Sequence, residues 1–135
     1  MPYRISYERT PDYLLVRMEG EEAFAEAIRF WQELARLAAE ELISRFLIVD
    51  TVVGQLSTTE HFEISEVVAR LFVGKRIAYV DPKEHTYESN QFGETVILNR
   101  GGFVKLFVSE ADAHAWLTGE TKPVSRRFGE ARPGE

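Results

Sequence analysis

The sequence predicts an α/β protein in which an N-terminal β-hairpin leads into a mixed, mostly parallel five-stranded sheet with about four helices. Near the N-terminus, apolar and polar residues alternate on both sides of a turn. Farther along, short apolar runs alternate with segments in which apolar residues recur every three or four positions. Alternation is typical of strands with one buried face, and strands that alternate with helices indicate parallel β–α–β units. The expected element order is therefore ββαβαβαβα.

The hairpin is predicted from residues 3–8 and 13–19, which flank the turn sequence Thr10-Pro11-Asp12. Gly20 ends the second strand, and the spacing of the apolar residues then changes. From Glu21 to Leu42 these residues recur at helical spacing, which predicts one long helix with a single buried stripe.

Two further segments have the composition of central strands. RFLIVD (residues 45–50) and RIAYVD (residues 76–81) each place four apolar residues between charged ones, as expected of a strand that is covered on both faces. A helix is predicted between them, over about residues 58–72. Strand, helix and strand of this length form a right-handed crossover in a parallel sheet.

The last elements follow a polar stretch at residues 83–91. Apolar residues at helical spacing predict a helix from about Phe92, which Gly101 or Gly102 can end. Residues 103–108 are a predicted strand, and the Ser-x-x-Asp sequence that begins at Ser109 is typical of a helix N-terminus.

Composition and charge limit the function. The chain has 135 residues, of which 44% are hydrophobic, so we expect a single folded domain over residues 1–118 and a flexible tail over 119–135. The net charge of -6 disfavours nucleic acid and anionic membranes as partners. The chain has no cysteine and no apolar run of membrane-spanning length, which favours a cytoplasmic protein without a membrane span.

The C-terminal part resembles a known family. The stretch ETVILNRGGFVKLFVSEADAHAWL, residues 94–117, is similar to the closing segment of the SpoIIAA-like branch of the STAS superfamily, which includes anti-sigma-factor antagonists. The resemblance extends over about residues 3–118. It implies a small bacterial cytoplasmic domain that is not an enzyme and that binds a partner protein or a small ligand through its strand-end loops.

The resemblance also implies a role for the loop after the central strand. In classical members a serine at the start of the following helix is phosphorylated, and that helix corresponds here to the one that begins in LSTTEH, residues 56–61. The classical Asp-Ser-Ser-Gly signature is missing, so the loop would be a degenerate phosphoswitch. The candidate residues for phosphate acceptance or for partner or ligand contact are Asp50, Thr51, Gly54, Ser57, Thr58 and Thr59.

The same residues also have a structural explanation. Ser57 and Glu60 have the spacing of a capping box, in which each side chain accepts a hydrogen bond from the other residue's backbone amide. Such a cap contributes about 0.5–2 kcal/mol, which is a sufficient reason for a serine at this position. We also expect His61, which follows the capping glutamate, to be a surface side chain.

A metal-dependent enzyme is the alternative hypothesis. Asp50 and Asp81 end two predicted neighbouring strands, and carboxylates at adjacent strand ends could together hold Mg²⁺. The sequence has no nucleotide-binding or hydrolase fingerprint, so we expect no cofactor and assign no catalytic residue. The chain has three histidines: His61, His85 and His114. No two of them have the short sequence spacing that is typical of metal ligands.

The C-terminal half is rich in aromatic residues, most of which we expect in the core. A second interpretation is an apolar pocket between the sheet and the helices, with Tyr87 and Phe92 as its gate. The ligand would then be small and apolar. An edge strand or exposed aromatic side chains could also form a homodimer.

Overall fold

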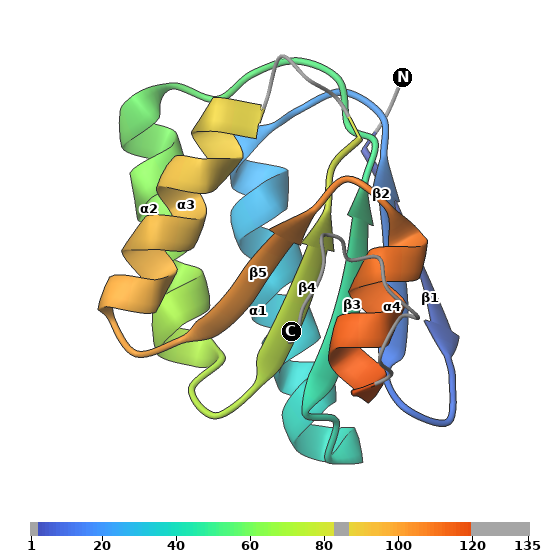
Figure 1. Cartoon of the computed structure of the whole chain (residues 1–135). Helices are drawn as coiled ribbons and strands as arrows, with labels where there is room; N and C mark the ends of the chain where they lie inside the picture. The colour runs from blue at the N-terminus through green and yellow to red at the C-terminus, as the bar shows by residue number, and fades with distance from the viewer. Residues whose placement is uncertain (1–2, 83–86, 120–135) are drawn as a thin grey trace, which may run out of the picture.

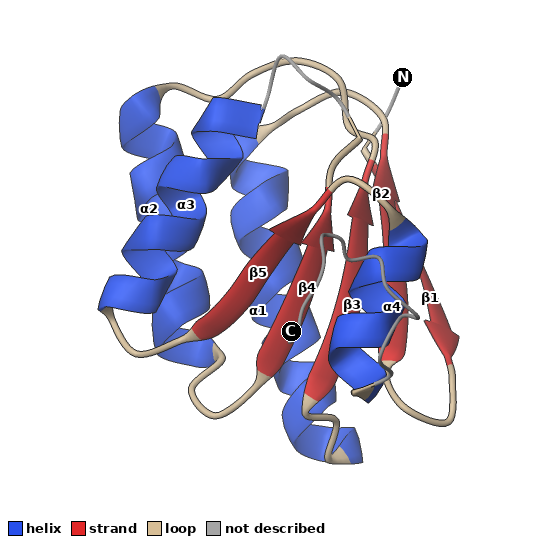
Figure 2. Ribbon diagram, viewed as in Figure 1, coloured by secondary structure: helices blue, strands red, loops and turns tan. Residues whose placement is uncertain are grey.

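The computed structural model describes residues 3–82 and 87–119, except for the side chains of residues 87–89. It contains a single five-stranded sheet with four helices, which confirms the predicted fold class (Figures 1 and 2). The elements in chain order are β1 (Arg4–Arg9), β2 (Leu14–Glu19), α1 (Phe24–Glu41), β3 (Arg45–Asp50), α2 (Thr58–Leu71), β4 (Arg76–Val80), α3 (Tyr87–Asn99), β5 (Phe103–Phe107) and α4 (Glu110–Thr118).

The strands lie side by side in the order of the sequence, β1-β2-β3-β4-β5. β1 and β2 are antiparallel, as predicted for the hairpin, and every later neighbouring pair is parallel. In the register of the two central strands, Val49 lies opposite Val80. The carboxyl ends of β2, β3, β4 and β5 therefore meet at one edge of the sheet.

The helices cover the two faces of the sheet unequally. α1, α2 and α3 lie on one face, which we call the three-helix face, and α4 lies on the other, which we call the α4 face (Figure 1). Because side chains alternate along a strand, Phe46 and Ile48 of β3 point to the three-helix face whereas Leu47 and Val49 point to α4. This double coverage explains why the central strands are apolar throughout.

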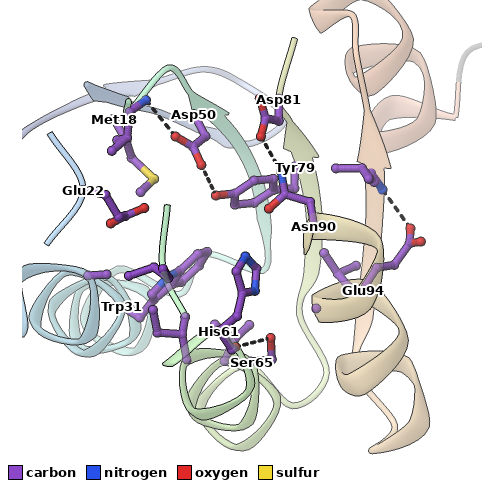
Figure 3. A pocket seen from close by; sticks show the side chains of 18 of the residues that line it. Met18, Glu22, Trp31, Asp50, His61, Ser65, Tyr79, Asp81, Asn90 and Glu94 are labelled. Carbon is purple, nitrogen blue, oxygen red and sulfur yellow. Dashed lines mark hydrogen bonds between the residues drawn. The ribbon is translucent and has the colours of Figure 1, made fainter. Parts of the chain in front are cut away.

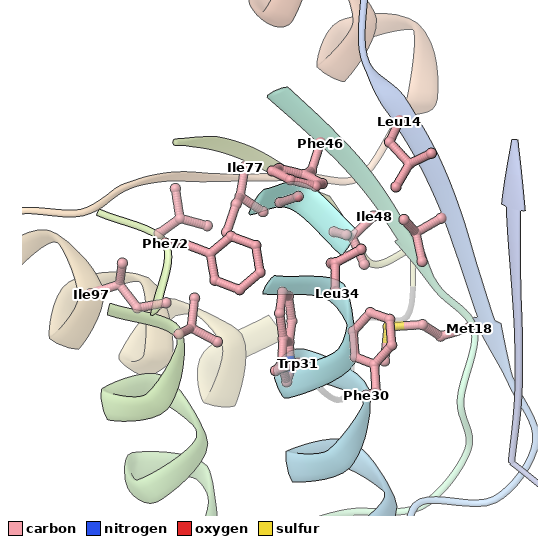
Figure 4. Packing of buried hydrophobic residues seen from close by; sticks show 14 of the residues in the cluster. Leu14, Met18, Phe30, Trp31, Leu34, Phe46, Ile48, Phe72, Ile77 and Ile97 are labelled. Atoms are coloured by element: carbon pink, nitrogen blue, oxygen red, sulfur yellow. The ribbon is translucent and has the colours of Figure 1, made fainter. Parts of the chain in front are cut away.

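The main core lies under the three helices and is built around Trp31 (Figure 4). The Trp31 ring meets the rings of Phe30 and Phe72 edge to face, with centroid distances of 4.8 and 5.6 Å. Phe72 in turn contacts Phe46 at 5.4 Å. These aromatic contacts fix α1 and the end of α2 against the central strand.

The predicted helix after the polar stretch is longer than expected. α3 begins at Tyr87, five residues before the position predicted from the apolar spacing. Its first turns are polar, so apolar periodicity alone could not detect them. The predicted tail lies outside the described residues after Gly119. Among the described helices, none combines the length and the apolar composition that crossing a bilayer requires.

Candidate functional site

A cavity of about 100 Å³ lies at the carboxyl edge of the sheet, beneath the three helices (Figure 3). Its floor is formed by side chains of the parallel strands, and its walls come from α1, α2 and α3. The loop that follows β3 and the segment that follows β2 form its rim. In open α/β sheets, this edge is where ligands usually bind.

Strand alternation brings the polar floor of the cavity together. Asp50 follows Ile48 by two residues at the end of β3, so its side chain points to the same face, the three-helix face. Tyr79 of β4 and Met18 of β2 share that face, and all three line the cavity. Asp81 follows Tyr79 by two residues and lines the cavity as well.

Asp50 is buried, with 8% of its surface exposed. Its Oδ1 accepts a hydrogen bond from the Val52 amide at 2.9 Å, and its Oδ2 accepts one from the Tyr79 hydroxyl. Burial raises the pKa of Tyr79, and the nearby Asp50 carboxylate raises it further. Tyr79 therefore stays protonated and acts as a donor that orients the carboxylate.

Asp81 is more deeply buried, with 1% of its surface exposed. The Asn90 side chain from α3 donates a hydrogen bond to Asp81 Oδ2, and the Asp81 amide donates to the Phe107 carbonyl at 3.0 Å. One helical turn later, Glu94 Oε2 accepts the Leu106 amide of β5 at 2.9 Å. These contacts tie α3 to the strand ends through buried or partly buried polar groups.

Two polar atoms beside the cavity have no hydrogen-bond partner. Among the side-chain atoms of the described residues, the Tyr3 hydroxyl and His61 Nδ1 are fully buried without one. Buried polar atoms are normally hydrogen-bonded, because an unsatisfied group costs about 1–3 kcal/mol. Both residues line the cavity, so a bound molecule could supply the missing contacts.

Burial shifts the pKa values of both side chains in the direction that favours their uncharged forms. It raises the pKa of Tyr3, and the carboxylates of Glu22, Asp50 and Glu26 raise it further. Burial lowers the pKa of His61, although Asp50 acts in the opposite direction. Near neutral pH the cavity wall therefore presents a phenol and an uncharged imidazole.

The expectation that His61 is a surface side chain is wrong. The residue lies one turn before Ile64 and Ser65 on α2, and the side chain points into the space between α2 and the sheet (Figure 3). Gly93 of α3 lies close to this turn of α2: a Cβ at that position would lie 3.0 Å from Ser65 Oγ, a tight contact, and 3.5 Å from His61 Nδ1, an ordinary one. The spacing to Ile64 and Ser65 was a signal for this burial.

The predicted loop is divided between the cavity and the cap of α2. Asp50 and Gly54 line the cavity. Thr51 does not, and its hydroxyl donates to the Met18 carbonyl at 3.0 Å. The predicted capping box of Ser57 and Glu60 is present, with its two hydrogen bonds at 3.1 and 2.9 Å. The remaining two candidates, Thr58 and Thr59, are exposed residues in the first turn of α2.

The loop is held in place by backbone pairing. The Val53 amide donates to the Gly20 carbonyl at 2.8 Å, and the Glu22 amide donates to the Val53 carbonyl at 2.8 Å. The segments that follow β2 and β3 therefore continue the parallel pairing beyond the strand ends. This pairing places Glu22 and the neighbouring Val52 at the rim of the cavity.

The two aspartates proposed as metal ligands line the same cavity. Among the described residues, however, no group of three or more histidine, cysteine, aspartate and glutamate side chains is arranged to hold a metal ion. The metal-dependent alternative stays a prediction that titration with Mg²⁺, Mn²⁺ and Zn²⁺ would test. Of the other histidines, His114 lies on the α4 face and His85 lies outside the described residues.

The predicted pocket gate has no support from the described side chains. Phe92 is 40% exposed, lies beside Phe62 with a centroid distance of 6.4 Å, and is not among the residues that line the cavity. Tyr87 begins α3, and its side chain is not described. The lining residues that the sequence did not suggest come from several elements: Tyr3, Glu22, Trp31, Ser65, Asn90 and Glu94.

The fold defines the class of this protein. A hairpin that leads into a parallel β–α–β sheet, with three helices on one face and one on the other, is a SpoIIAA-like fold. A crystal structure with this fold is that of an uncharacterized protein of the DUF3478 family from Shewanella loihica PV-4. The two chains superpose with a TM-score of 0.53 at 19% identity, over 85% of this chain and 93% of the other. No family model matches the sequence, and no curated protein matches it significantly.

Proposed function

We propose that the protein is a SpoIIAA-like binding domain that holds a small ligand in the cavity at the carboxyl edge of its sheet and has no catalytic activity. The observation that carries this proposal is the pair of buried atoms, Tyr3 hydroxyl and His61 Nδ1, that lack partners at the cavity. A ligand that bonded to both atoms would remove their desolvation cost.

The composition of the lining also supports small-ligand binding. Trp31, Ile64 and Ile77 give the cavity apolar walls, whereas Asp50 and His61 supply polar groups at defined positions. Ligand sites in proteins usually combine a mainly apolar surface with a few oriented polar groups. The cavity of about 100 Å³ is smaller than the roughly 150 Å³ cavity that binds benzene. It can therefore enclose a small ligand or part of an aromatic ring, with the remainder of the ligand at its open rim.

The loop after β3 offers a route from the ligand to a partner protein. Val52 and Leu56 line the cavity, whereas Val53 between them is 55% exposed. A ligand that changes the position of this loop would change the surface that a partner meets. Phosphorylation of Ser57, Thr58 or Thr59 belongs to the same regulatory hypothesis, and intact-mass analysis after incubation with lysate and ATP tests it.

Filling the cavity tests the binding function directly. Ala27 of α1 lines the cavity and is buried, so Ala27→Leu should occupy part of the ligand volume. Ala39→Leu makes the same change on the exposed side of the same helix and is the matched control. We expect small aromatic fragments to shift the NMR amide signals of Ser65 and Gly93 in the wild type and in Ala39→Leu, but not in Ala27→Leu.

Folding of both variants is checked by their thermal melting and by their dispersed amide spectra. If fragments shift the same signals equally in Ala27→Leu and in the wild type, the cavity is not their binding site. If no fragment shifts these signals in the wild type, the proposed function is wrong.

A further inference from the structure

The cavity lining has a strong excess of acidic groups. Four carboxyl side chains line it, and none of the described lining residues is a lysine or an arginine. They come from four separate segments that the fold brings together: Glu22, Asp50, Asp81 and Glu94. Carboxylates gathered around a partly enclosed space of low polarity create a negative potential, which repels anions and attracts cations.

The carboxylates of the lining act as hydrogen-bond acceptors. Asp50 accepts from the Val52 amide and the Tyr79 hydroxyl, and Glu94 accepts from the Leu106 amide. These donors fix the carboxylates in position, and an ionised carboxylate accepts hydrogen bonds without donating any. A ligand that fits this arrangement must supply N–H or O–H groups.

The two buried atoms without partners fit the same requirement. An uncharged imidazole has one ring nitrogen that accepts a hydrogen bond, and His61 Nδ1 can take that role when Nε2 carries the proton. The Tyr3 phenol oxygen can also accept. An alkylammonium group has three N–H donors and no acceptor, so its hydrogen-bonding groups match a carboxylate and these two atoms in kind.

The apolar part of the cavity suits the remainder of an amine. The rings of Trp31 and Tyr79 are nearly parallel, with an interplanar angle of 21° and centroids 6.5 Å apart. Aromatic rings bury a large apolar surface and pack well against other rings and hydrocarbon groups. Ile64, Val68 and Ile77 complete an apolar surface for a compact hydrocarbon group.

We propose that the cavity binds a small primary amine as its ammonium ion, with the nitrogen among Asp50, His61 and Tyr3 and the apolar body against Trp31 and Ile77. This inference rests on the proposed function, since it names the class of ligand for the same site. The carboxylates that raise the pKa of Tyr3 would favour a bound cation by the same field. The hydrogen bonds and this field must together offset the desolvation of the ammonium group.

The test compares three ligands of similar shape that differ in charge: benzylamine, benzyl alcohol and benzoate. The protein carries Trp116→Phe, which leaves Trp31 as the single tryptophan and preserves an aromatic ring on the α4 face. Binding is followed by Trp31 fluorescence and by the NMR amide signals of Ser65 and Gly93. We expect benzylamine to bind roughly tenfold or more tightly than benzyl alcohol, as for a hydrogen-bonded ion pair, and benzoate not to bind.

Variants assign the charge preference to the cavity. Asp50→Asn should lower the affinity for benzylamine roughly tenfold and change that for benzyl alcohol by less than about twofold. Glu22→Gln removes a charge at the rim, with less risk to folding, and should have a smaller effect in the same direction. Glu63→Gln, an exposed change on α2 outside the lining, should leave both affinities unchanged.

The outcomes separate this inference from the proposed function. Benzyl alcohol that binds as tightly as benzylamine and shifts the cavity signals overturns the amine inference and leaves cavity binding intact. Benzoate that binds more tightly than benzylamine also overturns it. If none of the three compounds binds, the amine inference is wrong, and the fragments tested against Ala27→Leu decide the broader function.

Discussion

The two faces of the sheet use a tyrosine and a histidine in opposite ways. On the α4 face, the Tyr13 hydroxyl and His114 Nδ1 lie 2.8 Å apart, within hydrogen-bond distance. On the three-helix face, the Tyr3 hydroxyl and His61 Nδ1 are both buried and have no hydrogen-bond partner. The same chemical groups are therefore close enough to pair on the α4 face, whereas beside the cavity they have no hydrogen-bond partner.

The apolar packing of the two faces also differs. Under α4, small residues such as Ala78 and Ala113 allow close contact and are completely buried. Under the three helices, the larger core around Trp31 fills the sheet only as far as the carboxyl edge, where the cavity opens. We therefore expect the α4 face to lose more stability than the cavity region of the three-helix face when a large side chain is removed.

Removing a large side chain from each face tests this difference most strongly. Leu117→Ala on the α4 face should lower the free energy of unfolding by about 3 kcal/mol, because Leu117 is fully buried and its loss leaves a new void. Ile64→Ala should cost less than about 2 kcal/mol, because Ile64 is only partly buried and lines an existing cavity. Urea denaturation followed by circular dichroism measures both values.

Equal losses for the two variants would contradict the idea that the three-helix face is the less tightly packed one. The slope of unfolding free energy against urea concentration serves as the control. A variant that changes this slope has altered the unfolded or native state more broadly, so its midpoint would not report packing alone.

The caps of α2 and α4 give a smaller contrast between the faces. Ser57 accepts the Glu60 amide at 3.1 Å within a complete capping box, whereas Ser109 accepts the Asp112 amide at 3.3 Å. We expect Ser57→Ala to cost about 1 kcal/mol and Ser109→Ala to cost less, again by urea denaturation. Ser57→Asp should retain most of the stability, because aspartate is also a good cap. A larger loss for Ser109→Ala would contradict this ranking.

Much of the fold could be predicted because it depends on local patterns. The alternation of β2 and the apolar runs of β3 and β4 determine which side chains point to each face of the sheet. The alternation of side chains along the strands is enough to place Met18, Asp50 and Tyr79 on one face. The start of α3 could not be predicted in this way. Its polar first turns are ordered by contacts such as Asn90 with Asp81, which belong to the tertiary structure.

The candidate site was predicted only in part, for a related reason. Asp50 and Gly54 belong to a loop whose position follows from the strand order, and both line the cavity. Trp31 and His61 reach the cavity from helices, and their contribution depends on how each helix is rotated against the sheet. That rotation depends on close approaches such as the one at Gly93, which a single sequence does not reveal.

Gly93 itself offers a test that separates stability from binding. In Gly93→Ala the new Cβ would lie 3.0 Å from Ser65 Oγ, a tight contact, whereas alanine in a helix is favoured over glycine by about 1 kcal/mol. We expect these effects to offset each other within about 1 kcal/mol. Affinity for cavity ligands should nevertheless fall, since the Ser65 side chain, which lines the cavity, must shift.

Gln91→Ala, an exposed change in the same helix, is the matched control and should leave ligand affinity unchanged. Fluorescence titration of Trp31 with benzylamine or an aromatic fragment measures the affinity, and urea denaturation measures the stability. Unchanged affinity in Gly93→Ala would show that the close approach of α2 and α3 does not shape the cavity.

The smallest expected effect is a dependence of stability on pH that arises from His61. Burial lowers the pKa of His61 in the folded protein, whereas an unfolded histidine titrates near about 6.5. Below that pH the unfolded chain binds a proton that the folded chain resists, so the free energy of unfolding must fall as the pH decreases toward the folded pKa. The nearby Asp50 carboxylate reduces this effect without reversing its sign.

Urea denaturation of the wild type and of His61→Gln at about pH 7.5 and about pH 5.5 isolates the contribution of the histidine. The wild type should lose more stability than the variant between these two values, and equal losses would mean that the cavity wall solvates the imidazolium as well as water does.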